Sequence, residues 1–110
     1  MTAASDNPYG KRYPSPSGAY AIVTVDNEVK MSHWISAPVL VDADAKTLLD
    51  FGSSWSADRV TWVDPDRVTI EMRHYPGDRD AVITIDAAAH TVTLADASVL
   101  TFEAFQSWLR

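Results

Sequence analysis

Two histidines, His33 and His74, are the side chains in this sequence best suited to chemistry. They end two similar segments, Val29-Lys30-Met31-Ser32-His33-Trp34 and Ile70-Glu71-Met72-Arg73-His74-Tyr75, in which apolar, charged, Met, polar, His and aromatic residues match in order. Two imidazoles that converge can bind a metal, but no third His, Cys or carboxylate stands at a recognisable ligand spacing from them. We therefore expect both histidines to be structural, and we expect no metal or cofactor.

Nucleophilic catalysis finds no support in the sequence. Ser32 and His33 are adjacent, so in a strand their side chains point to opposite faces and cannot share a proton. The sequence has no Gly-x-Ser-x-Gly segment and no cysteine, and its four glycines form no phosphate-binding loop. These features predict a protein that is not an enzyme.

Aspartates are concentrated between residues 42 and 66, where six of them occur with only two basic residues. Two pairs, Asp42/Asp44 and Asp64/Asp66, have the spacing of turns. The first pair lacks the continuation of a calcium-binding loop. An acidic segment of this kind suits the binding of a basic partner. The other interpretation is that these aspartates cap turns and keep the protein soluble.

Aromatic residues are the second group of candidate binding residues. Trp34 and Tyr75 occupy matching positions on the less apolar face of their segments, and Trp55 and Trp62 lie within the acidic stretch. Exposed aromatic rings on a sheet stack on sugars or anchor a protein partner, whereas buried ones fill a core. Phe51, Trp55 and Trp62, interleaved with the aspartates, predict an aromatic anchor with an acidic rim.

Composition and charge define the class of protein. The chain has 110 residues, 46% of them hydrophobic and 22% charged, which predicts one folded domain. Its formal net charge of −6 disfavours nucleic acid and anionic membranes as partners. The N-terminal residues have no apolar core of a signal peptide, and no stretch is long enough for a membrane span. We expect a cytoplasmic protein.

Alternating apolar and polar residues predict eight strands in two units. The unit 19–52 contains strands at 19–25, 28–36, 38–42 and 46–51, and the unit 56–95 contains strands at 58–63, 67–75, 81–86 and 90–95. A second match supports an internal repeat. It aligns Val41-Asp42-Ala43 to Thr47 with Ile85-Asp86-Ala87 to Thr91. Residues 1–18, with three prolines, are expected to form an extended or mobile arm, and residues 19–110 a single β domain.

The last residues have a different periodicity. Phe102, Phe105 and Trp108 recur at helical spacing, which predicts a helix over 101–109. Thr101 is suited to cap this helix and Glu103 to its first turn. A helix this short is marginal alone, so its aromatic stripe must pack against the sheets, where it would cover an open end or edge.

The segment Tyr13-Pro14-Ser15-Pro16-Ser17-Gly18-Ala19-Tyr20-Ala21-Ile22-Val23 resembles the Ser-Pro-Asp-Gly phrase that opens blades of TolB-type and WD-repeat propellers. Trp55-Ser56-Ala57-Asp58 is similar to the Trp-Ser-Pro-Asp form of this phrase, although Ala57 replaces the proline, as Ser17 replaces the aspartate of the first. The resemblance implies propeller-like blades, of which this chain has material for two. We predict an all-β fold with one short C-terminal helix, in which two tandem four-stranded antiparallel meanders pack as a β-sandwich or as two propeller-like blades.

The function expected from these observations is that of a non-enzymatic, acidic protein-binding module, of the inhibitor or immunity type, for a basic partner. The alternative is a carbohydrate-binding, lectin-like module assembled from two-bladed chains. The sequence leaves the oligomeric state open. The candidate binding residues are Trp34, Trp55, Trp62, Tyr75, Asp42, Asp44, Asp64 and Asp66.

Overall fold

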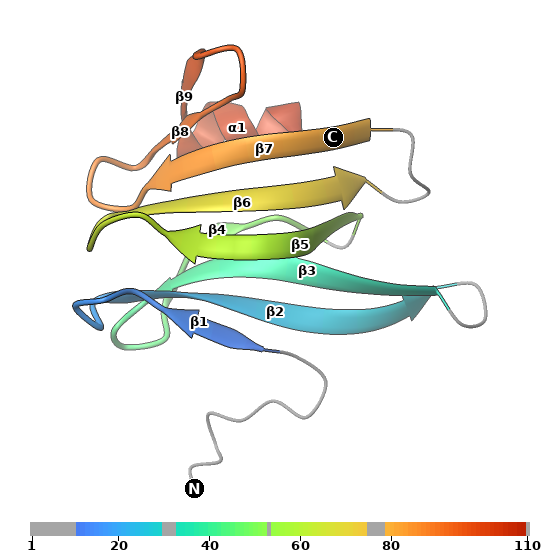
Figure 1. Ribbon diagram of the computed structural model, residues 1–110, viewed down its shortest axis with the longest axis horizontal. Helices are drawn as coiled ribbons and strands as arrows, with labels where there is room; N and C mark the ends of the chain where they lie inside the picture. Colours follow the sequence, from blue (N-terminus) through green and yellow to red (C-terminus); the bar gives the residue numbers. More distant parts are fainter. Residues whose placement is uncertain (1–10, 30–32, 53, 75–78, 110) are drawn as a thin grey trace, which may run out of the picture.

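The computed structural model describes residues 11–29, 33–52, 54–74 and 79–109, and it contains two antiparallel sheets (Figure 1). The first sheet has the strand order β1 (Arg12–Pro14), β2 (Tyr20–Val29), β3 (His33–Asp42) and β4 (Thr47–Asp50). Each strand pairs with the one before it in the chain, so the sheet is a meander, as predicted.

The second sheet has five strands rather than the four predicted. Their order is β5 (Trp55–Trp62), β6 (Arg67–His74), β7 (Arg79–Asp86), β8 (Thr91–Thr93) and β9 (Val99–Thr101). The strand predicted at 90–95 ends early, because the chain turns after β8 and returns as β9. Asp96 stabilises this turn, since its Oδ1 accepts a hydrogen bond of 2.9 Å from the backbone N–H of Ser98.

The strand boundaries predicted for the first unit were wrong around β2 and β3. Asp26 and Asn27, predicted as a turn, lie inside β2, and the predicted strands 28–36 and 38–42 are replaced by the single strand β3. Asp26 is accommodated in the sheet because its Oδ1 accepts a hydrogen bond of 2.8 Å from Oγ of Ser36, the residue paired with it on β3. This cross-strand contact outweighs the turn preference of an Asp-Asn pair.

The two sequence matches have different outcomes in the structure. Ile70 and His74 both lie in β6, whereas Val29 ends β2 and His33 begins β3, so the six-residue match does not mark equivalent strands. In the second match the two aspartates have similar positions. Asp42 and Asp86 each end a strand, and each accepts hydrogen bonds from two backbone N–H groups of the turn that follows.

The propeller-like phrases also differ in their structural positions. Ser15 to Gly18 form the turn between β1 and β2, in which the Gly18 N–H donates to the Ser15 carbonyl. Gly18 has a φ of +79°, which favours glycine. Trp55 to Asp58 lie within β5 instead. Part of the predicted N-terminal arm is therefore a strand and a turn of the first sheet, and residues 1–10 of it lie outside the described residues.

Both sheets and the helix contribute to one apolar core, which makes the chain an all-β sandwich. Ile22 and Leu40 enter it from the first sheet, and Ile70 and Ile83 from the second. The sheets also meet through a hydrogen bond of 3.0 Å from the Ser36 N–H on β3 to Ser56 Oγ on β5.

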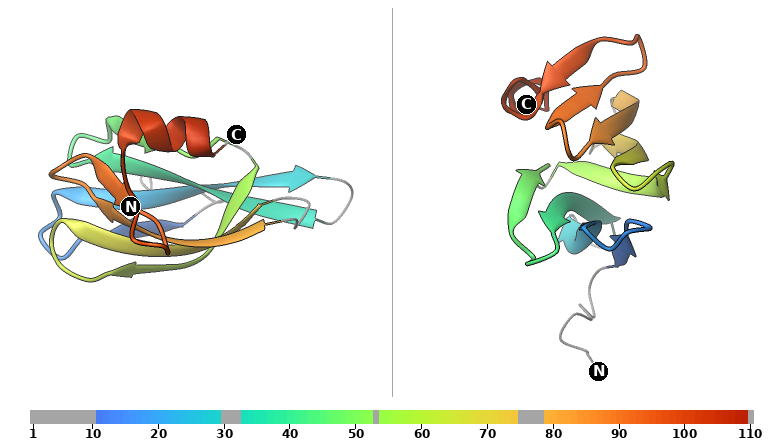
Figure 2. Two further views of the ribbon diagram at one scale, coloured as in Figure 1. Left: turned by 90° about the horizontal axis from the view of Figure 1, so that it is seen from above. Right: turned by 90° about the vertical axis from the view of Figure 1, so that its left-hand side faces the viewer.

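The helix α1 (Phe102–Trp108) confirms the prediction made for the last residues. Thr101 Oγ1 accepts a hydrogen bond of 3.1 Å from the Ala104 N–H, and Glu103 lies in the first turn. Phe105 is completely buried. Figure 2 shows the helix lying beside the strands and running in nearly the same direction, with its buried side chain in the core.

Candidate functional site

The turns that follow β1, β3, β5 and β7 all lie at one end of the strands, the left end in Figure 1. This arrangement brings together turns that are far apart in the sequence. The turns after β3 and β5 contain Asp44 and Asp66, and Asp42 and Asp64 lie at their starts. We call these four aspartates, with Asp86 at the end of β7, the acidic turn end.

Three of these aspartates, Asp42, Asp64 and Asp86, stabilise their own turns, and the hydrogen bonds of Asp86 are described above. Asp42 Oδ1 accepts hydrogen bonds of 2.9 Å from the N–H groups of Asp44 and Lys46. Asp64 Oδ1 accepts from the N–H groups of Asp66 and Arg67 at 2.9 and 2.8 Å, and its Oδ2 accepts from Arg67 Nε at 2.7 Å. For Asp42 and Asp64 the turn-capping interpretation therefore holds.

The other two aspartates face solvent. Asp44 and Asp66 are exposed, and their carboxylates have no hydrogen bond or ion pair with the residues that the structure describes. The Ala87 N–H donates to the Asp66 carbonyl at 2.8 Å, which holds the turn after β5 against the turn after β7. Val63, beside Asp64, is 57% exposed. The acidic turn end thus combines free carboxylates with an exposed apolar side chain on fixed turns.

The hydrogen bonds of Asp64 make a pH-dependent contribution to stability. The backbone N–H of Asp66 and then the Arg67 side chain lower the pKa of Asp64 below its ordinary value of 3.8. A carboxyl group whose pKa is lower in the folded chain stabilises the fold above its unfolded pKa, and this contribution is lost as the pH falls through the folded pKa.

We therefore predict that Asp64→Asn lowers the melting temperature near neutral pH and has little effect in acid. Asn retains the Oδ1 acceptor but lacks the charge that pairs with Arg67. Thermal unfolding between about pH 6 and about pH 2 would measure the difference. Asp44→Asn is the control. The prediction would be contradicted if the melting temperature of Asp64→Asn differed from that of the native chain by the same amount at every pH in this range.

The structure corrects the aromatic part of the predicted site. Trp55 is only 1% exposed, and its Nε1 donates a hydrogen bond of 2.9 Å to the Leu109 carbonyl. Its ring stacks on Trp108 and lies edge-on to His74, with centroid distances of 5.5 and 4.9 Å. Phe51 is also buried. Neither ring is accessible to a partner, because the helix and the sheets enclose both.

Of the remaining aromatic candidates, the structure describes only the side chain of Trp62. Trp62 is half-buried, and its Nε1 donates a hydrogen bond of 2.9 Å to the Tyr13 carbonyl, which ties β5 to β1. The side chain of Trp34 and the whole of Tyr75 lie outside the described residues. The side chain of His33 also lies outside them, and His74 contacts Trp55.

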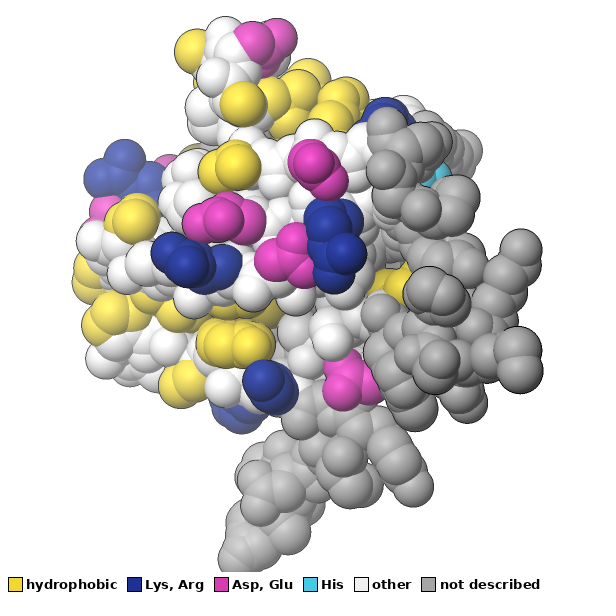
Figure 3. Space-filling view, turned by 45° about the vertical axis from the view of Figure 1, so that its right-hand side comes forward, with side chains coloured by type: hydrophobic (Ala, Val, Ile, Leu, Met, Phe, Trp, Pro, Cys, Tyr) yellow, Lys and Arg dark blue, Asp and Glu magenta, His cyan; other side chains and the backbone are white. Residues whose placement is uncertain are grey.

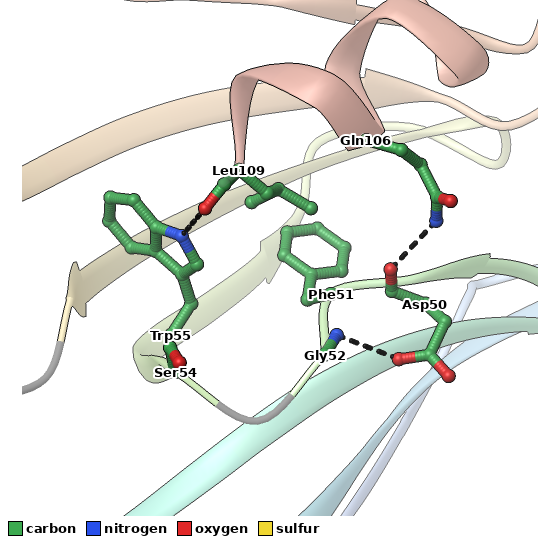
Figure 4. Close-up of a pocket in the computed structure, with 7 residues that line it drawn as sticks. All are labelled: Asp50, Phe51, Gly52, Ser54, Trp55, Gln106 and Leu109. Carbon is green, nitrogen blue, oxygen red and sulfur yellow. Dashed lines mark hydrogen bonds between the residues drawn. The ribbon is translucent and has the colours of Figure 1, made fainter.

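A pocket of about 280 Å³ lies between α1 and the link from β4 to β5 (Figure 4). Gln106 Nε2 donates to the Asp50 carbonyl at 2.8 Å, and the Asp50 carboxylate accepts from the Gly52 N–H at 2.8 Å. Asp50 is the one titratable side chain among the described residues that line the pocket. Its carboxylate already caps the turn at Gly52. The lining residues offer no nucleophile with a base beside it. They are Asp50, Phe51, Gly52, Ser54, Trp55, Gln106 and Leu109.

Neither a metal site nor a membrane-spanning helix is found in the described part of the chain. It holds no group of three or more His, Cys, Asp or Glu side chains arranged to bind a metal ion. None of its helices has the length and apolar character needed to cross a bilayer.

Comparisons with protein-family models, curated proteins and solved structures found no match to this chain. The acidic turn end is therefore interpreted from its own geometry. Sequence reasoning missed the exposed Val63 beside this site and one of its members, Asp86. The match of Asp86 to Asp42 was the signal that pointed to the second of these.

Proposed function

We propose that this chain is a non-enzymatic protein-binding module, of the inhibitor or immunity type, that binds a basic protein at the acidic turn end. The observation that supports the proposal is that Asp44 and Asp66 are exposed in two separate turns at one end of the strands, and that neither carboxylate has a hydrogen bond or ion pair with the described residues. Arg67, a basic residue at this end, is already paired with Asp64. The five aspartates of the acidic turn end outnumber the basic residues Lys46 and Arg67 beside them, and such an excess of negative charge on fixed turns attracts a basic surface and orients it.

Electrostatic attraction of this type acts mainly on the rate of association. The exposed Val63 supplies apolar contact beside the carboxylates, so the complex does not depend on charge alone. Because Asp42 and Asp64 cap turns, their replacement would alter the turns as well as the charge. Asp44 and Asp66 are the better residues to change.

We predict that Asp44→Asn/Asp66→Asn slows association with a basic probe about tenfold at low salt and makes the rate less dependent on salt. The probe is an arginine-rich peptide of about eight residues, and surface plasmon resonance measures its association and dissociation rates. A control variant, Asp58→Asn/Glu71→Gln, removes the same amount of charge from the outer face of β5 and β6. Equal slowing in both variants would show an effect of net charge only and would contradict a site at these turns.

The carbohydrate-binding alternative depended on exposed aromatic rings. Trp55 is buried, and the indole N–H of Trp62 is bonded to the Tyr13 carbonyl. Neither of these two rings supports a stacking platform for a sugar. The protein-binding proposal is therefore preferred, and saturable binding on a glycan array by the native chain would favour the alternative.

A further inference from the structure

Strand β7 has a hydrogen-bonding edge that its neighbours leave open over more than half of its length. On one side, β6 pairs with β7 along Arg79–Asp86. On the other side, β8 pairs only with Thr84–Asp86, because the chain turns away after Thr93. Along Arg79–Ile83, about 16 Å of strand, the backbone groups that point outward find no strand among the described residues.

A groove of about 270 Å³ runs along this open edge. Leu94 and Trp108, both half-buried, form its apolar walls, and Val82, 47% exposed, lies on the outer side of the strand. Figure 3 shows hydrophobic side chains gathered at the upper edge of the molecule beside the projecting β8–β9 hairpin. An added strand would place alternate side chains against these walls and the others outward.

The outward side of the groove is acidic. Asp80 and Asp96 line it, and both are exposed. Arg73 is opposite Asp80 in the register of β6 and β7, but its Nε binds Asp58 at 2.8 Å, and Asp80 has no ion pair with the described residues. Arg79 is directed to the inner side, where its Cζ lies 5.0 Å from the centre of the Trp55 ring. A strand added here would meet negative charge on its outer face.

The outermost strands of the two sheets offer less to a partner. β5 has eight residues, but it lies against the first sheet, where the Ser36 N–H donates to Ser56 Oγ and Trp62 Nε1 donates to the Tyr13 carbonyl. The other three outermost strands, β1, β4 and β9, are three or four residues long. Short outer strands of this kind are a usual protection against unwanted pairing. The open part of β7 is longer and has an apolar groove beside it.

We propose that Arg79–Ile83 binds an extended peptide segment of a partner protein by strand addition. The segment alternates apolar residues, which fill the groove beside Leu94 and Trp108, with basic residues, which face Asp80 and Asp96. Main-chain hydrogen bonds supply affinity in this mode, and the alternating side chains supply specificity. The proposal does not depend on the acidic turn end, because Asp80 and Asp86 are separated by about 20 Å along β7.

The test uses a blocked, fluorescent peptide of about seven residues in which valine and lysine alternate. We expect saturable binding in fluorescence anisotropy, and protection of the amides of residues 79–83 from hydrogen exchange when the peptide is present. A peptide N-methylated at every residue should bind at least about tenfold more weakly, because neither of its edges can donate to β7. Equal binding of the methylated peptide would overturn strand addition.

Variants of the protein show whether the peptide binds at the open edge of β7 or at the acidic turn end. Asp80→Lys should weaken peptide binding about tenfold, and the conservative Asp80→Asn should weaken it less. Asp44→Lys makes the same change of charge at the other end and should leave binding within about twofold. If Asp44→Lys weakened binding as much as Asp80→Lys, the peptide would be held at the acidic turn end, which overturns this inference but agrees with the proposed function. A dimer in sedimentation, with residues 79–83 protected without peptide, would overturn it in favour of a second copy of the chain.

Discussion

Replacing Trp55 by alanine is expected to lower the free energy of unfolding by about 3–5 kcal/mol, the range found for large buried aromatic residues. The substitution removes a ring that is 1% exposed and leaves a cavity between the second sheet and the helix. It also leaves the Leu109 carbonyl without the indole N–H that binds it at 2.9 Å. Lost packing and an unsatisfied carbonyl act in the same direction.

Urea unfolding followed by circular dichroism would measure this loss. Trp55→Phe retains most of the packing and loses the hydrogen bond, so we expect an intermediate effect. Trp62→Ala is the comparison at a half-buried site, and its effect should be smaller than that of Trp55→Ala. An alanine variant at Trp55 with native stability but weakened binding of the arginine-rich peptide would mean that Trp55 is a binding residue after all.

Phe105→Ala is expected to have an effect of similar size, about 3–5 kcal/mol. Phe105 is completely buried, lies edge-on to Phe51 with a centroid distance of 5.3 Å, and stacks on Trp108. It is the one helix residue of α1 that is fully enclosed in the core. Since seven residues do not form a stable helix alone, the loss of this side chain should detach the whole helix from the sheets.

Near-ultraviolet circular dichroism is the sharper measurement for Phe105→Ala, because it reports on the fixed stack of Trp55 and Trp108. We expect the near-ultraviolet signal of the tryptophans to fall, while the far-ultraviolet signal of the strands stays the same. The control is Ser107→Ala, an exposed substitution in the same helix that should change stability by no more than about 0.5 kcal/mol. If the tryptophan signal persisted in Phe105→Ala, the helix would be held by contacts other than this ring.

Local features were predicted well from the sequence where neighbouring residues decide the structure. The turn at Asp64 and Pro65, the capping of α1 by Thr101 and the alternating strand β6 depend on contacts within a few residues. Such patterns are visible in the order of residues, because turn geometry and helix caps are local. Four of the five aspartates of the candidate site, all except Asp86, were found in this way.

The errors arose where distant segments meet. Asp26 and Asn27 favour a turn, but the pairing of β2 with β3 keeps them extended. The sequence suggested that the tryptophan at position 55 is an anchor among aspartates, because nothing in the neighbouring residues shows that the end of α1 covers it. The open edge of β7 was missed because it depends on where β8 stops pairing.

By itself the sequence determined the all-β class, the acidic turns and the capped C-terminal helix, since periodicity, turn residues and caps are properties of short segments. Only the tertiary structure decided which aspartates remain free, which tryptophans are buried and which strand edge stays open. These properties depend on contacts between residues such as Trp55 and Leu109, which are far apart in the chain. Burial and strand pairing are set by the packing of whole sheets, so the positions of accessible groups followed from the fold rather than from any single motif.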